Sequence, residues 1–126
     1  MNKPVLGIQG YTLREFCQNE EDFDNILGFL QELGVKTIQI SAIGPIPADV
    51  QKKALDKHKI DVCVTHKPFD RMLGDLDALI EEHKIINCDA IGLGAPSDEY
   101  TGTFEKVKNF VEKANAVAKK LKKHGM

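Results

Sequence analysis

The sequence lacks several features that would assign a chain of 126 residues to a specialised class. Its only cysteines, Cys17, Cys63 and Cys88, are widely separated and form no CxxC pair, so neither a disulfide framework nor a zinc knuckle is expected. Positive and negative charges are nearly balanced, because the chain has 17 lysines and arginines and 19 acidic residues, for a net charge of −2. This balance argues against a nucleic-acid partner, since proteins that bind a phosphate backbone carry a basic surface.

No hydrophobic run is long enough to span a bilayer, and the segment after Met1 has neither the basic nor the apolar region of a secretory signal. We therefore expect a cytoplasmic protein with reduced thiols and no membrane partner. Low-complexity segments and linkers are also missing. With 42% hydrophobic and 29% charged residues, the chain has the composition and length of one globular domain, which we place at residues 1–126.

The sequence does contain a regular alternation of strand-like and helix-like segments. Runs of aliphatic and β-branched residues predict strands at about 4–11, 37–41, 61–65 and 90–94. Apolar residues at helical spacing predict helices at about 19–33, 48–58, 76–86 and 104–121. Asn19 and Thr103 are the predicted N-caps of the first and last helix, and Gly34 is predicted to end the first. Strict alternation of this kind predicts an α/β fold with a parallel sheet and right-handed crossovers.

The predicted strands alternate between aliphatic residues and small or polar ones, which indicates that helices cover only one face of the sheet. The aliphatic face carries Leu6, Ile8, Ile38, Ile40, Val62, Val64, Ile91 and Leu93. The opposite face carries Gly7, Gln9, Tyr11, Thr37, Gln39, Ser41, Cys63, Thr65, Gly92 and Gly94. A sheet covered on both faces would instead read as continuous apolar runs. A complete (β/α)₈ barrel takes roughly 250 residues, so we expect a (β/α)₄ half of a TIM barrel, with a polar lumen.

The most informative stretch is Val62–Pro68, a β-branched run that stops at His66. Parallel α/β sheets bind their ligands at the carboxyl ends of the strands, so a histidine at this position is expected to meet one. Gln9, Tyr11 and Gln39 lie on the predicted polar face. Arg14 follows the first strand and could bind a phosphate or carboxylate with two hydrogen bonds. Together with His66, these four residues are our candidate substrate-binding residues, and no catalytic residue is assigned.

An alternative interpretation is that these polar residues form only a solvated face and that Arg14 is a surface charge. His58 and His83 fall inside predicted helices and are interpreted as structural or solvated. The pair Gly92 and Gly94 does not form a phosphate-binding loop, because the third glycine of GxGxxG and the helix directly after it are missing.

Several segments, in order along the chain, resemble the xylose isomerase-like superfamily of TIM barrels, in particular its sugar phosphate isomerase/epimerase group. They are GIQGYTLR at 7–14, LGVKTIQIS at 33–41, VTHKPF at 64–69, and the segments 75–83 and 88–94. The resemblance extends over the whole chain and corresponds to the N-terminal half of such an enzyme. It implies binding of a sugar or sugar phosphate, with Mg²⁺, Mn²⁺ or Zn²⁺ as a Lewis acid while a carboxylate moves the proton.

The chain departs from this pattern at Gln39, where relatives commonly carry a glutamate, because an amide cannot take a proton. The family's metal ligands also lie mostly in the C-terminal half, so we expect this chain alone to bind no metal and to turn over no substrate. Whether it is an enzyme is left open. A second hypothesis is a self-assembling half-barrel, a homo-oligomer that pairs its open strand edges. A third is a small flavodoxin-like ligand-binding domain.

Overall fold

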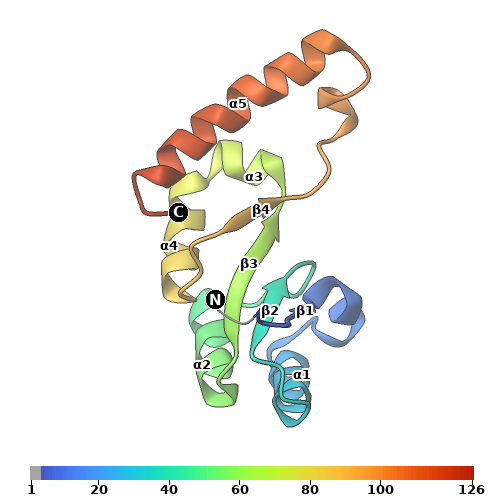
Figure 1. Ribbon diagram of the computed structural model, residues 1–126, viewed down its shortest axis with the longest axis vertical. Helices are drawn as coiled ribbons and strands as arrows, with labels where there is room; N and C mark the ends of the chain where they lie inside the picture. Colours follow the sequence, from blue (N-terminus) through green and yellow to red (C-terminus); the bar gives the residue numbers. More distant parts are fainter. Residues whose placement is uncertain (1–3) are drawn as a thin grey trace.

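The computed structural model describes residues 4–126 as one parallel four-stranded sheet with connecting helices (Figure 1). The elements are β1 (Ile8–Gln9), η1 (Gly10–Phe16), α1 (Glu20–Glu32), β2 (Thr37–Ile40), α2 (Ala48–His58), β3 (Asp61–Lys67), α3 (Phe69–Gly74), α4 (Leu76–Ile85), β4 (Ile91–Leu93), η2 (Asp98–Tyr100) and α5 (Phe104–Lys122). The first three residues of the predicted domain 1–126 lie outside the described residues. No helix of residues 4–126 is long and apolar enough to cross a membrane.

The strand order is β1-β2-β3-β4, and each strand pairs in parallel with the next one along the chain. Successive β-α units produce this order in a barrel wall. A doubly wound sheet differs, because its strand order reverses at a switch point. The predicted (β/α)₄ arrangement is therefore confirmed, and the strand order does not support the flavodoxin-like alternative.

Two hydrophobic clusters cover one face of the sheet. The first joins α1 and α2 to β2 and β3 through Phe23, Leu27, Leu30, Ile38, Ile40, Leu55 and Val62. The second joins α3, α4, η2 and α5 through Phe69, Met72, Leu76, Leu79, Ile80, Tyr100 and Val117. On the opposite face lies an open hollow of about 910 Å³, lined among others by Val5, Gln9, Thr37, Gln39, Cys63 and Val64. The sheet is therefore one-sided, as the strand pattern predicts.

Helix ends follow the predicted capping residues. The side chain of Asn19 accepts a hydrogen bond from the Asp22 N–H at 2.9 Å, and Thr103 accepts one from the Lys106 N–H at 3.3 Å. Gly34 has φ +79° and follows the end of α1, where this left-handed conformation favours glycine. The boundaries of α1 and α5 are thus set by local sequence.

A β-bulge in β3 reverses the predicted alternation. Val62 and Val64 pair with successive residues of β2, so Cys63 between them is an extra residue. Beyond the bulge, Thr65 faces the helices and is fully buried, whereas Val64 lines the open hollow. The predicted faces of Val64 and Thr65 were therefore wrong, because a strict period of two assumes that no residue is inserted.

Both helical histidines have structural roles, as predicted. His83 is fully buried, with Nε2 2.6 Å from the Thr65 hydroxyl and Nδ1 2.6 Å from the Leu79 carbonyl oxygen. His58 joins α2 to α1, since its Nε2 lies 2.9 Å from Asp24 Oδ1.

The first strand is shorter than predicted. The chain leaves the sheet at Gly10, which approaches β2 so closely that a Cβ there would lie 2.6 Å from the Gln39 carbonyl oxygen. Tyr11 consequently belongs to η1 and not to a strand. Leu6, which was predicted to lie under the helices, is 90% exposed.

Two further segments differ from prediction. Residues 69–74, between the predicted strand at 61–65 and the predicted helix at 76–86, form α3, which buries Phe69 and Met72. In α5, Phe104, Val107 and Val111 of the predicted apolar face are exposed, because no element of residues 4–126 covers that part of the helix.

Candidate functional site

Two of the predicted binding residues meet at the carboxyl ends of β2 and β3. The side-chain amide nitrogen of Gln39 lies 2.8 Å from Nε2 of His66, and both residues are half-buried. The amide N–H donates, so Nε2 accepts and the ring proton of this neutral imidazole is on Nδ1. The sequence placed His66 at a strand end and Gln39 on the polar face, and the structure brings the two into direct contact.

Gly92 of β4 provides the space that the imidazole occupies. It pairs with His66 in the β3–β4 ladder. A Cβ at this position would lie 2.5 Å from Cδ2 and 3.1 Å from Nε2 of the His66 ring. Such contacts are too short, so a larger residue would displace the ring. Glycine here lets the imidazole lie across the neighbouring strand, and sequence reasoning missed this role because nothing near Gly92 in the chain signals it.

A third predicted residue extends this pair into a row across the sheet. Gln9 of β1 pairs with Gln39 in the β1–β2 ladder, and both line the open hollow. Side chains of paired residues in a parallel ladder share a face. The row Gln9, Gln39 and His66 therefore offers amide donors, amide acceptors and an imidazole side by side on three successive strands.

Tyr11 and Arg14 form a separate local pair in η1. The Arg14 guanidinium carbon lies 4.2 Å from the centre of the Tyr11 ring, and Nη1 donates to the Tyr11 carbonyl oxygen at 2.9 Å. Nη2 lies 3.7 Å from a carboxylate oxygen of Glu15. Within residues 4–126, no hydrogen bond or ion pair joins this pair to Gln39 or His66. A binding role for Tyr11 and Arg14 stays a prediction.

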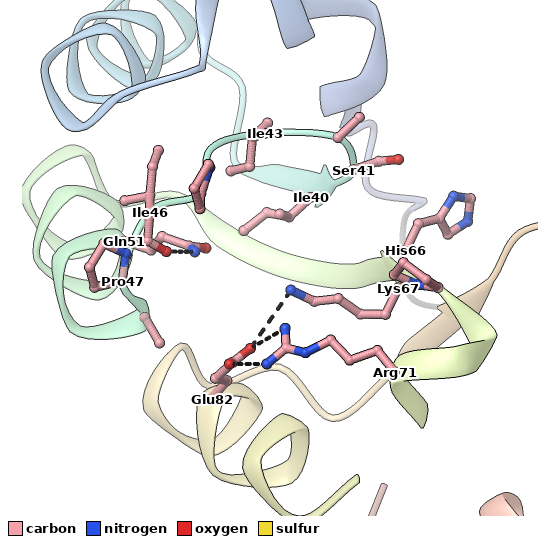
Figure 2. A pocket seen from close by; sticks show the side chains of 14 residues that line it. Ile40, Ser41, Ile43, Ile46, Pro47, Gln51, His66, Lys67, Arg71 and Glu82 are labelled. Atoms are coloured by element: carbon pink, nitrogen blue, oxygen red, sulfur yellow. Dashed lines mark hydrogen bonds and ion pairs between the residues drawn. The ribbon is translucent and has the colours of Figure 1, made fainter. Parts of the chain in front are cut away.

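A cavity of about 720 Å³ lies beside the end of β3 (Figure 2). Ile40, Ile43 and Ile46 line one side of it, whereas Lys67, Arg71 and Glu82 line the other. His66 also lines this cavity, and its imidazole points away from the Lys67 ammonium (Figure 2). The end of β3 thus contributes both an imidazole and an ammonium to the cavity.

The charged side of this cavity is an ion cluster centred on Glu82. Arg71 binds both of its carboxylate oxygens, one of them at 3.2 Å, and Lys67 Nζ lies 3.8 Å away. Burial alone would raise the pKa of Glu82, but the hydrogen bonds and charge of Arg71 outweigh it and hold the pKa below its ordinary value. Burial lowers the pKa of Lys67, which Glu82 partly opposes.

The ion cluster ties the end of β3 and α3 to α4. Sequence reasoning missed it, because the turn after His66 was not expected to form a helix that directs Arg71 toward Glu82. The available signal was the spacing of Lys67 and Arg71, two cations four residues apart just beyond a strand end. Both cations are already paired with the same carboxylate, so we assign the cluster a role in holding these elements together.

Residues 4–126 do not fit a divalent metal. Nowhere in this part of the chain do three His, Cys, Asp or Glu side chains gather closely enough to hold a metal ion. At the open face, Nε2 of His66 is engaged by an amide, and Gln39 supplies no carboxylate. Hard and borderline divalent ions prefer several carboxylate, imidazole or water ligands.

Comparison with known proteins establishes the architecture. Neither a protein-family model nor a curated protein matches this chain. An AP endonuclease of family 2 from Brucella melitensis is similar, with 18% identity and a TM-score of 0.73 over 98% of this chain and 53% of that one. A sugar phosphate isomerase/epimerase from Parabacteroides distasonis is also similar, with 18% identity and a TM-score of 0.72 over 100% of this chain and 50% of that one.

The chain spans about half the length of both solved structures, with almost all of its own residues included. At 18% identity such a likeness concerns the fold alone. It agrees with the strand order and with the one-sided sheet. The chain therefore has the fold of about half of a TIM barrel.

Proposed function

We propose that this chain is the sugar-binding N-terminal half of a sugar or sugar phosphate isomerase/epimerase-like barrel, and that it turns over no substrate by itself. The observation that carries this proposal is the Gln39–His66 hydrogen bond above Gly92, at the carboxyl ends of adjacent strands. Barrels of this architecture place their sites at that end. The similar protein from Parabacteroides distasonis, named as a sugar phosphate isomerase/epimerase, supports the choice of ligand class.

The chemistry of the row suits binding of a polyol. Sugar hydroxyls both donate and accept hydrogen bonds, as do the amides of Gln9 and Gln39. The Nδ1–H of His66 adds a donor whose ring orientation is held by Gln39. Tyr11 and Arg14 are proposed to contact a phosphate group, which a guanidinium binds with two hydrogen bonds.

The same row does not supply proton transfer at a carbon. Isomerisation next to a carbonyl needs a general base and stabilisation of the negative charge that develops on oxygen. An amide cannot act as the base, and the only lone pair of the His66 ring is engaged by Gln39. We therefore propose that the base and the ligands for Mg²⁺, Mn²⁺ or Zn²⁺ come from residues outside this chain.

The similarity to the AP endonuclease of Brucella melitensis does not lead us to propose nucleic acid as a ligand of this chain. The net charge of −2 gives this chain no excess of cations to neutralise a phosphate backbone. The charge balance and the polar row together favour a small neutral or singly phosphorylated sugar.

The test is a titration of the ¹⁵N-labelled chain with fructose 6-phosphate and with sorbitol, followed by NMR. We expect saturable shifts at Gln9, Gln39, His66 and Gly92, with dissociation constants on the order of millimolar, because half a barrel leaves the ligand partly in water. His66→Ala should weaken binding at least about tenfold. The matched control is His124→Ala, which changes an exposed histidine near the chain end and should leave binding unchanged.

Shifts confined to other parts of the chain, or equal effects of the two histidine variants, would contradict the proposed site. Turnover is measured separately, with fructose 6-phosphate and added Mn²⁺. We expect none, and measurable isomerisation would contradict the proposal that the chain is inactive alone.

A further inference from the structure

The large hydrophobic side chains exposed in residues 4–126 concentrate on the first and last units of the sheet. Of eleven such residues, six precede residue 34 and three belong to α5, whereas only Leu73 and Ile85 lie between them. Leu6 is 90% and Phe104 79% exposed. A protein rarely gathers large exposed apolar side chains in one part of its surface without a partner to cover them. The two ends of the half-barrel are therefore the places where a neighbour is missing.

On α1, the exposed residues lie on the flank that faces away from α2. Asp24 and Gln31 mark the side toward α2, because both contact the His58 ring, at 2.9 Å and 3.1 Å. At 100° per residue, Phe29 and Leu33 project from roughly the opposite side of the helix. They are 53% and 63% exposed. This flank of α1 therefore exposes two large hydrophobic side chains on the side away from α2.

On α5, the exposed residues lie on the flank that faces away from α4. Lys120 Nζ lies 2.7 Å from Asp77 of α4 and marks the α4 side. Phe104, Val107 and Val111 extend the buried face of the helix toward the other side, where they are exposed. In Figure 1, α5 runs along the end of the molecule opposite α1 and α2.

The sheet is open at the same two ends. Within residues 4–126, β1 pairs only with β2, and β4 only with β3. The Thr65 N–H donates to the Ala90 carbonyl oxygen at 3.2 Å, so parallel pairing leaves the N–H and C=O of Ile91 on the open side of β4. Unpaired backbone groups of this kind favour association with another strand, and closure into a barrel removes them.

We propose that two copies of this chain close an eight-stranded barrel, with a twofold axis along the barrel axis. β4 of each copy pairs with β1 of the other, and α5 of each copy packs against the Phe29 and Leu33 flank of α1 of the other. A rotation about the barrel axis keeps the strand direction, so the new pairs are parallel like the existing ones. The two interfaces are identical, and no edge is left over.

A second copy fits the missing part because this chain spans only 53% and 50% of the two similar barrels. The hollow of about 910 Å³ on the open face becomes part of the barrel interior in the dimer. Each lumen then contains two rows of Gln9, Gln39 and His66, one from each copy. The inference rests on the fold and on exposed surface, and not on the proposed sugar chemistry.

The experiment is sedimentation velocity of the chain from about 5 to 200 µM, a range in which an interface of ordinary size is populated. We expect one discrete species of twice the 14.0 kDa of a single chain. Val111→Asp changes a residue that is 47% exposed in one copy, so the fold should persist. Each dimer would remove two of the new carboxylates from water, one at each interface. This should raise the dissociation constant of the dimer at least about a hundredfold.

The matched control is Ile85→Asp, because Ile85 is 43% exposed but belongs to α4, between the two ends. We expect this variant to remain a dimer. Hydrogen exchange adds a second readout: the Ile91 amide should be protected in the dimer and lose that protection in Val111→Asp.

Three results would overturn the proposal: a monomer across the whole concentration range, a series of ever larger species, or equal effects of the two Asp variants. If the chain is monomeric throughout, we would instead infer that a segment of a longer polypeptide covers the open face. The sugar titration can be repeated on Val111→Asp, so that failure of the dimer and failure of the sugar site are distinguished.

Discussion

The buried pair of Thr65 and His83 supports a prediction whose sign and size follow from geometry. Nδ1 of His83 lies 2.6 Å from the Leu79 carbonyl oxygen, which can only accept, so Nδ1 donates. Nε2 must then accept in the neutral ring, and the Thr65 hydroxyl at 2.6 Å is its donor. Both side chains are fully buried, so water cannot replace either partner.

Removing both partners should therefore cost less than the sum of the two single removals. Thr65→Val keeps the shape of the side chain but leaves Nε2 without a donor, which costs about 1–3 kcal/mol of unfolding free energy. His83→Leu leaves the Thr65 hydroxyl without its acceptor at a similar cost. The double variant has no unsatisfied group at this site. We expect it to be less destabilised than the sum of the two single variants by about 1–2 kcal/mol.

The same pair makes stability depend on pH. Burial lowers the pKa of His83, and the charges of Lys67 and Arg71 lower it further, although Glu82 and the bond to Leu79 act in the opposite direction. The unfolded chain therefore binds a proton at pH values where the folded chain does not. Stability is full above about pH 6.5, the ordinary histidine value, and falls with decreasing pH toward the lowered pKa, by at most about 1.4 kcal/mol per pH unit.

The assay is urea unfolding of the four chains of this cycle between pH 5 and 8, each followed by circular dichroism. Below about pH 6.5, the unfolding free energy should depend less steeply on pH in His83→Leu, because the proton that only the unfolded chain binds at this site is lost. His124→Leu, which changes an exposed histidine, should leave this slope unchanged. Strictly additive single and double variants would refute the assigned hydrogen bond. An unchanged slope in His83→Leu would refute the assigned protonation state.

Two further predictions concern the ends of β3 and β4. Gly92→Ala places a Cβ 2.5 Å from the His66 ring and should cost about 1–3 kcal/mol and shift the His66 ring signals in NMR, whereas Gly94→Ala, with nothing within 4 Å, should do neither. Glu82→Gln should lower unfolding free energy in urea by about 1 kcal/mol above the ordinary glutamate pKa of about 4.3, and by progressively less as the pH falls toward the lowered pKa of this carboxyl, because the unfolded chain takes up the proton first. Glu81→Gln, which affects only an exposed pair with Lys84, should stay within about 0.5 kcal/mol, and equal losses in the two Glu variants would contradict the cluster.

Local features of the sequence were sufficient to predict the series of elements and the one-sided sheet. Asn19, Gly34 and Thr103 act on backbone groups within a few residues of themselves, so their effects can be read from short segments. The aliphatic alternation reports burial correctly in β2, where Ile38 and Ile40 are buried, and with the length of the chain it predicts half a barrel. The position of His66 at a strand end follows from the same local reading.

Tertiary structure alone decided what those elements bring together. The inserted Cys63 moves Thr65 under the helices, and no local pattern distinguishes a bulged strand from a regular one. The contact of His66 with Gln39, and the space left by Gly92, depend on the register between strands that are far apart in sequence. Propensity acts over a few neighbouring residues, whereas register and packing are settled only when the whole sheet assembles. The sequence could therefore indicate where a site lies, but not which side chains touch within it.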